Sequence, residues 1–115
     1  MARSDFNWIP FTHEFTDDDP TLTVEFPIEG TPIDDGYLLI TAHNVTHQDH
    51  QIFINNQELS GFDIAMHSSG WQTWMDRIPA GVLQSGTNSI QVVRTFDDDF
   101  TTKDIVVHWR EQAGR

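Results

Sequence analysis

The sequence predicts an all-β protein, an antiparallel jelly-roll β-sandwich of about seven or eight short strands. Apolar residues recur at every second position along several segments, and clusters of Gly, Pro, Asn and Asp separate these segments. No window of about 11 residues keeps the apolar spacing of an amphipathic helix. Short strands that are separated by turns, without helices between them, form antiparallel sandwiches or barrels.

The length of the chain indicates one domain that spans residues 1–115. A domain of this size buries roughly 65% of its unfolded surface, which is enough for a single hydrophobic core. There is no cysteine, so disulfides and thiolate metal sites are excluded. Apolar stretches such as Tyr37–Ile40 are too short to cross a bilayer, and the start MARSDFNW lacks the apolar region of a signal peptide. We therefore expect a cytoplasmic location, or export by a route that needs no signal peptide.

Acidic residues outnumber Lys and Arg by 18 to 6, which gives a net charge of −12. A field of this sign repels phosphate backbones and anionic lipid headgroups, so neither nucleic acid nor a membrane is an expected partner. Lys103 is the only lysine in the chain. Two explanations of the acidic surface stay open: a strongly hydrated soluble surface, or a halophile's adaptation in which salt screens the self-repulsion.

The first half of the chain predicts an edge strand followed by three further strands. In TLTVEFPI, residues 21–28, apolar and polar side chains alternate, as in a strand with one buried face. The segment GYLLITAHNV is apolar on both faces at first, as in a central strand that is covered on each side. QIFIN is its partner strand, and Asn55 and Asn56 suit a tight turn with positive φ. FNWIPFTHEF adds a strand that is interrupted at Pro10, which suits the edge of a sheet.

The second half predicts three more strands. The first covers residues 71–78 and ends at Pro79, and AGVLQSGTN forms one turn that is closed by Gly86. NSIQVVRTF directs Ile90 and Val92 inward, whereas DIVVHWR places Ile105, Val107 and Trp109 on one face. Between these two strands, DDDFTTKD is expected to be a loop that is too charged to be buried.

Three segments resemble the galactose-binding-like jelly-roll superfamily, which includes carbohydrate-binding modules. They are INNQEL, the stretch WQTWMDRIPAGVLQSGTNSIQV from Trp71 to Val92, and DFTTKDIVVHWRE. The matching features are structural, since Leu83, Gly86 and Asn88 would shape a loop and anchor the core in any member. The resemblance therefore implies the fold more than the ligand. It also implies that a structural calcium ion is an option, because many members carry one.

The tryptophans offer candidate sugar-stacking side chains. Trp71 and Trp74 are three residues apart on a strand and point to opposite faces. If Trp74 shares the buried face with Ile78, Trp71 faces the solvent; in the alternative, both tryptophans pack inside the sandwich. Trp109 is expected in the core, and Trp8 stays open.

The candidate ligand-binding residues are Trp71, which would stack on a sugar ring, and Arg77, Asp76 and His67, which would form hydrogen bonds. The candidate calcium ligands are Asp97, Asp99, Asp104 and Glu111, although no EF-hand pattern is present and acidic loops are more often solvated. His43, His47 and His50 lie around one turn with Asp49 nearby. This spacing matches no established zinc motif, so we expect solvated histidines.

No catalytic motif is present: there is no G-x-S-x-G elbow, no Gly-rich phosphate loop and no H-E-x-x-H. The sequence therefore favours a non-catalytic module that binds carbohydrate through a sandwich face or its loop rim. The alternative is a structural or adaptor protein that self-associates as a homo-oligomer or docks onto a larger protein assembly. An exposed stripe of Trp71 and Met75 would then be a protein interface.

Overall fold

The computed structural model describes residues 2–46, 50–59, 67–95 and 97–112, with residues 67–69 described by their backbone alone. These residues form eight strands and no helix, which confirms the predicted all-β fold. Accordingly, none of them belongs to a helix with the length and hydropathy of a membrane span. The strands are β1 (Ala2–Phe15), β2 (Thr21–Ile28), β3 (Pro32–Val45), β4 (Gln51–Ile54), β5 (Gln57–Glu58), β6 (His67–Ile78), β7 (Gly86–Val93) and β8 (Phe100–Gln112).

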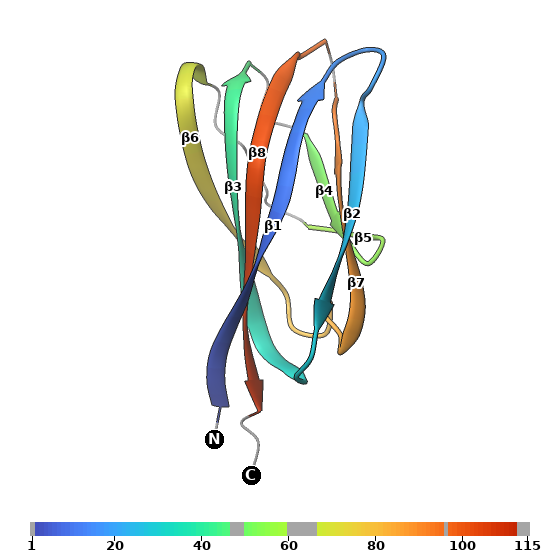
Figure 1. Ribbon diagram of the computed structural model, residues 1–115, viewed down its shortest axis with the longest axis vertical. Helices are drawn as coiled ribbons and strands as arrows, with labels where there is room; N and C mark the ends of the chain where they lie inside the picture. Colours follow the sequence, from blue (N-terminus) through green and yellow to red (C-terminus); the bar gives the residue numbers. More distant parts are fainter. Residues whose placement is uncertain (1, 47–49, 60–66, 96, 113–115) are drawn as a thin grey trace.

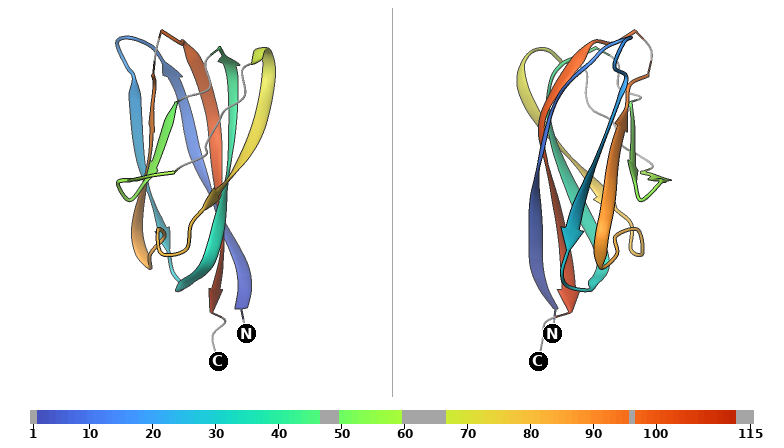
Figure 2. Two further views of the ribbon diagram at one scale, coloured as in Figure 1. Left: turned by 180° about the vertical axis from the view of Figure 1, so that it is seen from behind. Right: turned by 45° about the vertical axis from the view of Figure 1, so that its right-hand side comes forward.

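The strands form two four-stranded antiparallel sheets. The first sheet has the order β1-β8-β3-β6 and the second has the order β2-β7-β4-β5. Figures 1 and 2 show the two sheets packed face to face, with both termini at the same end of the molecule. The edge position of β1 was predicted from Pro10, and the register of β1 against β8 shifts between Pro10 and His13. The structure thus has the predicted sandwich architecture, with one long edge strand in the first sheet.

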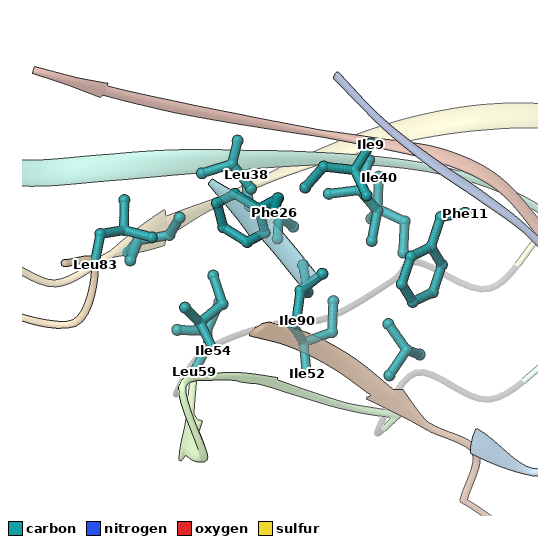
Figure 3. Packing of buried hydrophobic residues seen from close by; sticks show 14 of the residues in the cluster. Ile9, Phe11, Phe26, Leu38, Ile40, Ile52, Ile54, Leu59, Leu83 and Ile90 are labelled. Atoms are coloured by element: carbon teal, nitrogen blue, oxygen red, sulfur yellow. The ribbon is translucent and has the colours of Figure 1, made fainter. Parts of the chain in front are cut away.

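The core lies between the sheets and is built from alternate side chains of the facing strands (Figure 3). Leu38 and Ile40 of β3 meet Ile52, Ile54 and Ile90 of the second sheet in this layer, and all five are fully buried. Each fully buried side chain of this size contributes roughly 1.5–3 kcal/mol of transfer free energy. The inward positions predicted in the last two strands are confirmed, because Ile90, Val92, Ile105, Val107 and Trp109 are buried.

The predicted turns also form. Asn55 and Asn56 have φ angles of 51° and 66°, and the turn places Leu59 so that its N–H donates to the Ile52 carbonyl at 2.9 Å. Gly86 has φ 89°, a conformation that a side chain would strain. Next to it, the Asn88 side chain accepts from the Gln84 N–H at 2.9 Å and donates to the Gln84 carbonyl at 2.8 Å. The side-chain amide of Asn88 therefore holds the turn between β6 and β7 closed.

One expectation about the acidic loop was wrong. DDDFTTKD is not an exposed loop throughout, because Phe100 starts β8 and Asp98 is only 1% exposed. The Asp98 carboxylate accepts hydrogen bonds from the Thr46 N–H at 3.0 and 3.1 Å, and from the Thr46 hydroxyl. These donors replace the water that the carboxylate loses on burial. One aspartate of the triplet is therefore a structural residue.

His50 completes this buried network, which corrects the expectation of a solvated histidine. Its side chain is buried against the Phe100 ring, with the ring centroids 4.3 Å apart. The Nδ1 atom accepts from the Thr95 N–H at 3.0 Å, so the proton resides on Nε2, which donates to Asp98. The network joins the segment after β3 to the segment before β8. Of the other predicted turn residues, His47 and Asp49 lie outside the described residues.

Candidate binding face

The outward side of the first sheet carries a group of exposed large side chains. We call this side the outer face. The strand register arranges its side chains in rows that cross the sheet from β1 through β8 and β3 to β6. The three rows at the end near the termini are Ser4–Arg110–Ile33, Phe6–His108–Tyr37–Arg77 and Trp8–Val106–Leu39–Met75.

Two of these rows form the aromatic patch, which we define as Phe6, Trp8, Tyr37, Met75 and the partly exposed Val106 and Leu39. The exposed fractions are 61% for Phe6, 57% for Trp8, 41% for Tyr37 and 65% for Met75. The expectation that β3 is covered on both sides was therefore wrong. Its second apolar face belongs to the aromatic patch, and no element of the described residues packs on it. Such an exposed contiguous apolar patch marks an interaction site.

A polar band borders the aromatic patch. The hydroxyls of Thr41 and Thr73 lie 2.9 Å apart and share a hydrogen bond across β3 and β6. The Trp8 indole N–H donates to Asp104 Oδ2 at 3.2 Å, which orients the ring over the neighbouring strand β8. An aromatic ring with a fixed orientation loses little conformational entropy when a ligand stacks on it. The face therefore offers ring surfaces beside hydroxyl and carboxylate groups.

Trp71 lies on the same face but at the other end. It is 50% exposed, which places it on the solvent side as its alternation with Trp74 predicted. Its ring centroid is 5.1 Å from that of His43, and Lys103 Nζ lies 5.9 Å from the indole centroid. Trp74, by contrast, packs partly buried against the core. The first of the two arrangements considered for these tryptophans is the one that forms.

The four predicted ligand-binding residues do not form one site. Arg77 lies on the outer face but six residues from Trp71 along β6, which corresponds to about 20 Å. Asp76 pairs with the buried Leu38, so it lies on the opposite side of the sheet from Trp71. His67 pairs with Val45 through its backbone, and its side chain lies outside the described part of the structure.

Arg77 has a local partner. Its Nη1 lies 2.7 Å from Asp35 Oδ2, and Asp35 Oδ1 accepts from the Ala80 N–H at 2.9 Å. The hydrogen bond from Arg77, followed by that from Ala80, lowers the pKa of the Asp35 carboxyl below its ordinary value. This pair fixes the end of β6 to the irregular part of β3.

The four predicted calcium ligands do not converge. Asp97 is exposed, Asp99 accepts from Arg94, and Asp104 accepts from Trp8 on the outer face. Glu111 is buried on the inward side of β8, near the end of the strand. Within the described ranges, no three His, Asp or Glu side chains are grouped so that they could hold a metal ion.

Glu111 instead lies in a cleft of about 480 Å³ between β1 and the segment after β2. Its carboxylate accepts from the Trp109 indole at 2.9 Å and from Arg3 Nε at 2.8 Å. A Cβ on Gly30 would come within 2.6 Å of this carboxylate, so any side chain there would displace Glu111 from its partners. The cleft is thus lined by an ion pair that ties the start of β1 to the end of β8.

This ion pair predicts an acid-sensitive contribution to stability. The hydrogen bond from Trp109, and then that from Arg3, lower the pKa of the Glu111 carboxyl below its ordinary value. A lowered folded-state pKa stabilises the fold above the unfolded value of about 4.3, and this stability is lost as the pH falls through the folded value. In urea titrations between pH 7 and 3, Glu111→Gln should therefore give a flatter pH profile than the wild type. Glu29→Gln, an exposed control in the same cleft, should keep the wild-type slope, and equal slopes for both variants would contradict the assignment.

Sequence reasoning missed Phe6, Trp8 and Tyr37 as site residues. The segment FNWIPF places aromatic or apolar side chains on both faces of the strand, so alternation alone does not say which face is buried. The sequence does contain one indication: Ile9, Phe11 and Phe15 all occupy odd-numbered positions of the strand, and all three are buried. Because side chains alternate along a strand, the even-numbered Phe6 and Trp8 point outward.

Solved structures with the same fold have low sequence identity to this chain. A family 35 carbohydrate-binding module from an environmental isolate has a TM-score of 0.61 and 20% identity, over 84% of this chain and 73% of that one. A family 35 module from Clostridium thermocellum has a TM-score of 0.61 and 12% identity, over 90% of each chain. Dimeric latent PorU from Porphyromonas gingivalis reaches a TM-score of 0.71 at 11% identity, over 96% of this chain. The chain spans only 13% of the length of that PorU chain.

These similarities show the fold, which is a β-sandwich like that of carbohydrate-binding modules. Among curated proteins, none matches the sequence. Residues 3–111 match the profile of a protein family described as a family of unknown function, DUF7383. Because this match covers nearly the whole sequence, the chain belongs to the DUF7383 family.

Proposed function

We propose that this protein is a non-catalytic carbohydrate-binding module whose ligand stacks on the outer face of the first sheet. The observation that carries the proposal is the aromatic patch, in which Phe6, Trp8 and Tyr37 are exposed together on one regular sheet. Apolar faces of pyranose rings pack on aromatic rings, while their hydroxyls need hydrogen-bonding partners.

The spacing of the patch supports an extended ligand. Phe6 and Tyr37 lie in one row but are separated by β8, so about 10 Å lies between their backbone positions. Trp8 lies two residues from Phe6 on the same strand and adds a second ring beside it. The Thr41 and Thr73 hydroxyls and the Asp104 carboxylate border these rings. A chain of several sugar units could therefore contact ring surfaces and polar groups alternately.

The solved carbohydrate-binding modules support this proposal through their fold, which is shared over most of the chain. Among the described residues, the aromatic patch is a surface of exposed side chains. A flat, open site suits binding because an enzyme must surround its substrate to exclude water from the reacting bond. The aromatic patch therefore supports binding rather than catalysis.

The proposal predicts that Trp8→Ala and Tyr37→Ala each weaken glycan binding about tenfold or more, because each removes a stacking surface worth roughly 1–3 kcal/mol. The thermal midpoint should change little, since both side chains are exposed in the free protein. Binding would be found first on a polysaccharide array and then measured by isothermal titration.

Phe53→Ala is the matched control, because Phe53 lies on β4 with its neighbours Ile52 and Ile54 buried, so it points outward from the second sheet. It should leave glycan affinity unchanged. A protein that binds no polysaccharide on the array, or a Phe53 variant that loses as much affinity as the Trp8 variant, would contradict the proposal. Concentration-dependent mass in light scattering that Trp8→Ala abolishes would instead identify the patch as a contact between copies of the chain.

A further inference from the structure

The end of the outer face near the termini carries cationic side chains, in contrast to the acidic character of the whole protein. The whole chain has a net charge of −12, with 18 acidic residues and only 6 Lys or Arg. In the three rows of the outer face near the termini, all within the described residues, no paired position carries a carboxylate; Asp104 lies in the next row, beside Trp8. The same rows carry two arginines, Arg77 and Arg110, together with His108. The charge of the protein is therefore distributed unevenly.

The remaining described cationic residues lie either on the outer face or in ion pairs elsewhere. Lys103, the only lysine, also lies on the outer face, above the Trp71 ring. Arg3 and Arg94 are occupied elsewhere by ion pairs with Glu111, Asp17 and Asp99. The outward side of the second sheet carries Glu25 and Glu58 but neither Lys nor Arg among its paired positions. The end of the outer face near the termini therefore differs in charge from the outward side of the second sheet.

Arg110 is the best placed of these cations. It is exposed on β8 and pairs with Ser4 and Ile33, one row from Phe6 and Tyr37. Diagonal neighbours on adjacent strands lie about 7–8 Å apart, so an arginine side chain at this position is long enough to reach the edge of the aromatic patch. Among the described residues, no carboxylate lies within ion-pair distance of its guanidinium, whereas Arg77 keeps its pair with Asp35. Arg110 therefore offers its planar set of donors to a ligand.

Building on the proposed function, we propose that the glycan is acidic, with a carboxylate or sulfate group that Arg110 binds while the sugar rings stack on Phe6, Trp8 and Tyr37. A guanidinium binds such anions through two parallel hydrogen bonds. The long-range field of the protein opposes a polyanion, but screening at physiological salt limits this field to about 8 Å, so the local groups decide. Arginine beside exposed aromatic rings combines anion binding with stacking in one surface.

The test compares pairs of polymers that differ only in the anionic group. One arm uses uronate polysaccharides and their carboxyl-reduced counterparts, and a second arm uses dextran sulfate and dextran. The wild type should bind at least one acidic form about tenfold more tightly than its neutral counterpart. The arm that shows the preference identifies the anion as carboxylate or sulfate.

Two variants with the same change in net charge locate the effect. Arg110→Gln should abolish the preference for the acidic polymer, and Arg110→Lys should retain part of it. Gln91→Glu, on the outward side of the second sheet, also lowers the net charge by one and should leave the preference intact. An equal loss in the Gln91 variant would show a general charge effect and would overturn the inference.

The experiment distinguishes failure of this inference from failure of the proposed function. Binding of neutral and acidic polymers with equal affinity overturns this inference and leaves the proposed function in place. The absence of binding to every polymer overturns both. If light scattering shows self-association that Arg110→Gln abolishes, Arg110 binds an acidic surface of a second copy. This outcome would also overturn the inference that the ligand is an acidic glycan.

Discussion

Asp98→Ala is expected to destabilise the fold by about 3–5 kcal/mol, because it removes one partner from a buried hydrogen-bonded pair. The variant would leave the buried His50 Nε2–H without its acceptor. It would also remove the hydrogen bonds that the exposed residue Thr46 donates through its N–H and its hydroxyl. A buried donor without its acceptor costs about 1–3 kcal/mol, and the His50 N–H cannot regain water while the site stays closed. Each hydrogen bond from Thr46 to the charged carboxylate contributes about 1.5–3 kcal/mol. The side chains of His50 and Asp98 are fully buried in the native structure.

The neighbouring Asp97 supplies the control for this prediction, because it is exposed and belongs to the same acidic run. Asp97→Ala should change the free energy of unfolding by no more than about 0.5 kcal/mol. Urea unfolding followed by tryptophan fluorescence would give both values, with unchanged m-values showing that the comparison is valid. Similar losses in the two variants would mean that the buried network does not contribute as the structure indicates.

Trp109→Ala should cost about 3–5 kcal/mol, the usual penalty for truncating a buried aromatic side chain. Trp109 is 3% exposed, and its indole N–H donates to Glu111, so the variant opens a cavity and also removes a hydrogen bond from a buried carboxylate. Trp71→Ala is the matched change at a tryptophan that is 50% exposed, and it should cost less than about 1 kcal/mol.

Thermal and urea unfolding of the two tryptophan variants would check this contrast. Trp109→Phe adds a useful intermediate, because it restores most of the ring volume but still leaves Glu111 without its indole donor. We expect its stability to fall between those of the wild type and Trp109→Ala. A loss at Trp71 as large as that at Trp109 would show that Trp71 packs more tightly than its exposure indicates.

The fold could be predicted from the sequence because the decisive pattern is local. The alternation in residues 21–28 and the shared parity of Ile105, Val107 and Trp109 each depend on side chains that are two residues apart. The turn at Asn55 and Asn56 depends on backbone preferences of these two residues alone. Such signals do not require knowledge of which strands pair.

The network around Asp98 could not be predicted in this way, because its members come from distant segments. Asp98 is 48 residues from His50 and 52 residues from Thr46 in the sequence. Within the run Asp97–Asp98–Asp99, nothing local distinguishes the buried carboxylate from its exposed neighbours. The distinction arises only when the segments after β3 and before β8 come together.

The prediction of the candidate site was incomplete for a related reason. Trp71 faces outward, as one of its two predicted arrangements required, but its distance from Arg77 along β6 keeps the two apart, and the aromatic patch combines strands from both ends of the chain. Trp8 of β1 shares a row with Val106 of β8 and Leu39 of β3. A row of this kind follows from strand order and register, neither of which the alternation of a single strand specifies.

The pairing of β1 with β8 also has a consequence for how the protein folds. Among the described residues of the first sheet, β1 has only β8 as its hydrogen-bonded neighbour, so the strand of this sheet that comes first in the sequence pairs with the one that comes last (Figure 1). Closing such a long loop carries an entropic cost before any contact forms, which makes folding slow for a domain of this size. Until β8 is available, the apolar side chains Ile9, Phe11 and Phe15 of β1 lack their main partner strand. The nascent chain therefore depends on remaining soluble with β1 unpaired, and the acidic residues that flank β1, such as Asp17 and Asp18, supply the charge repulsion that opposes aggregation.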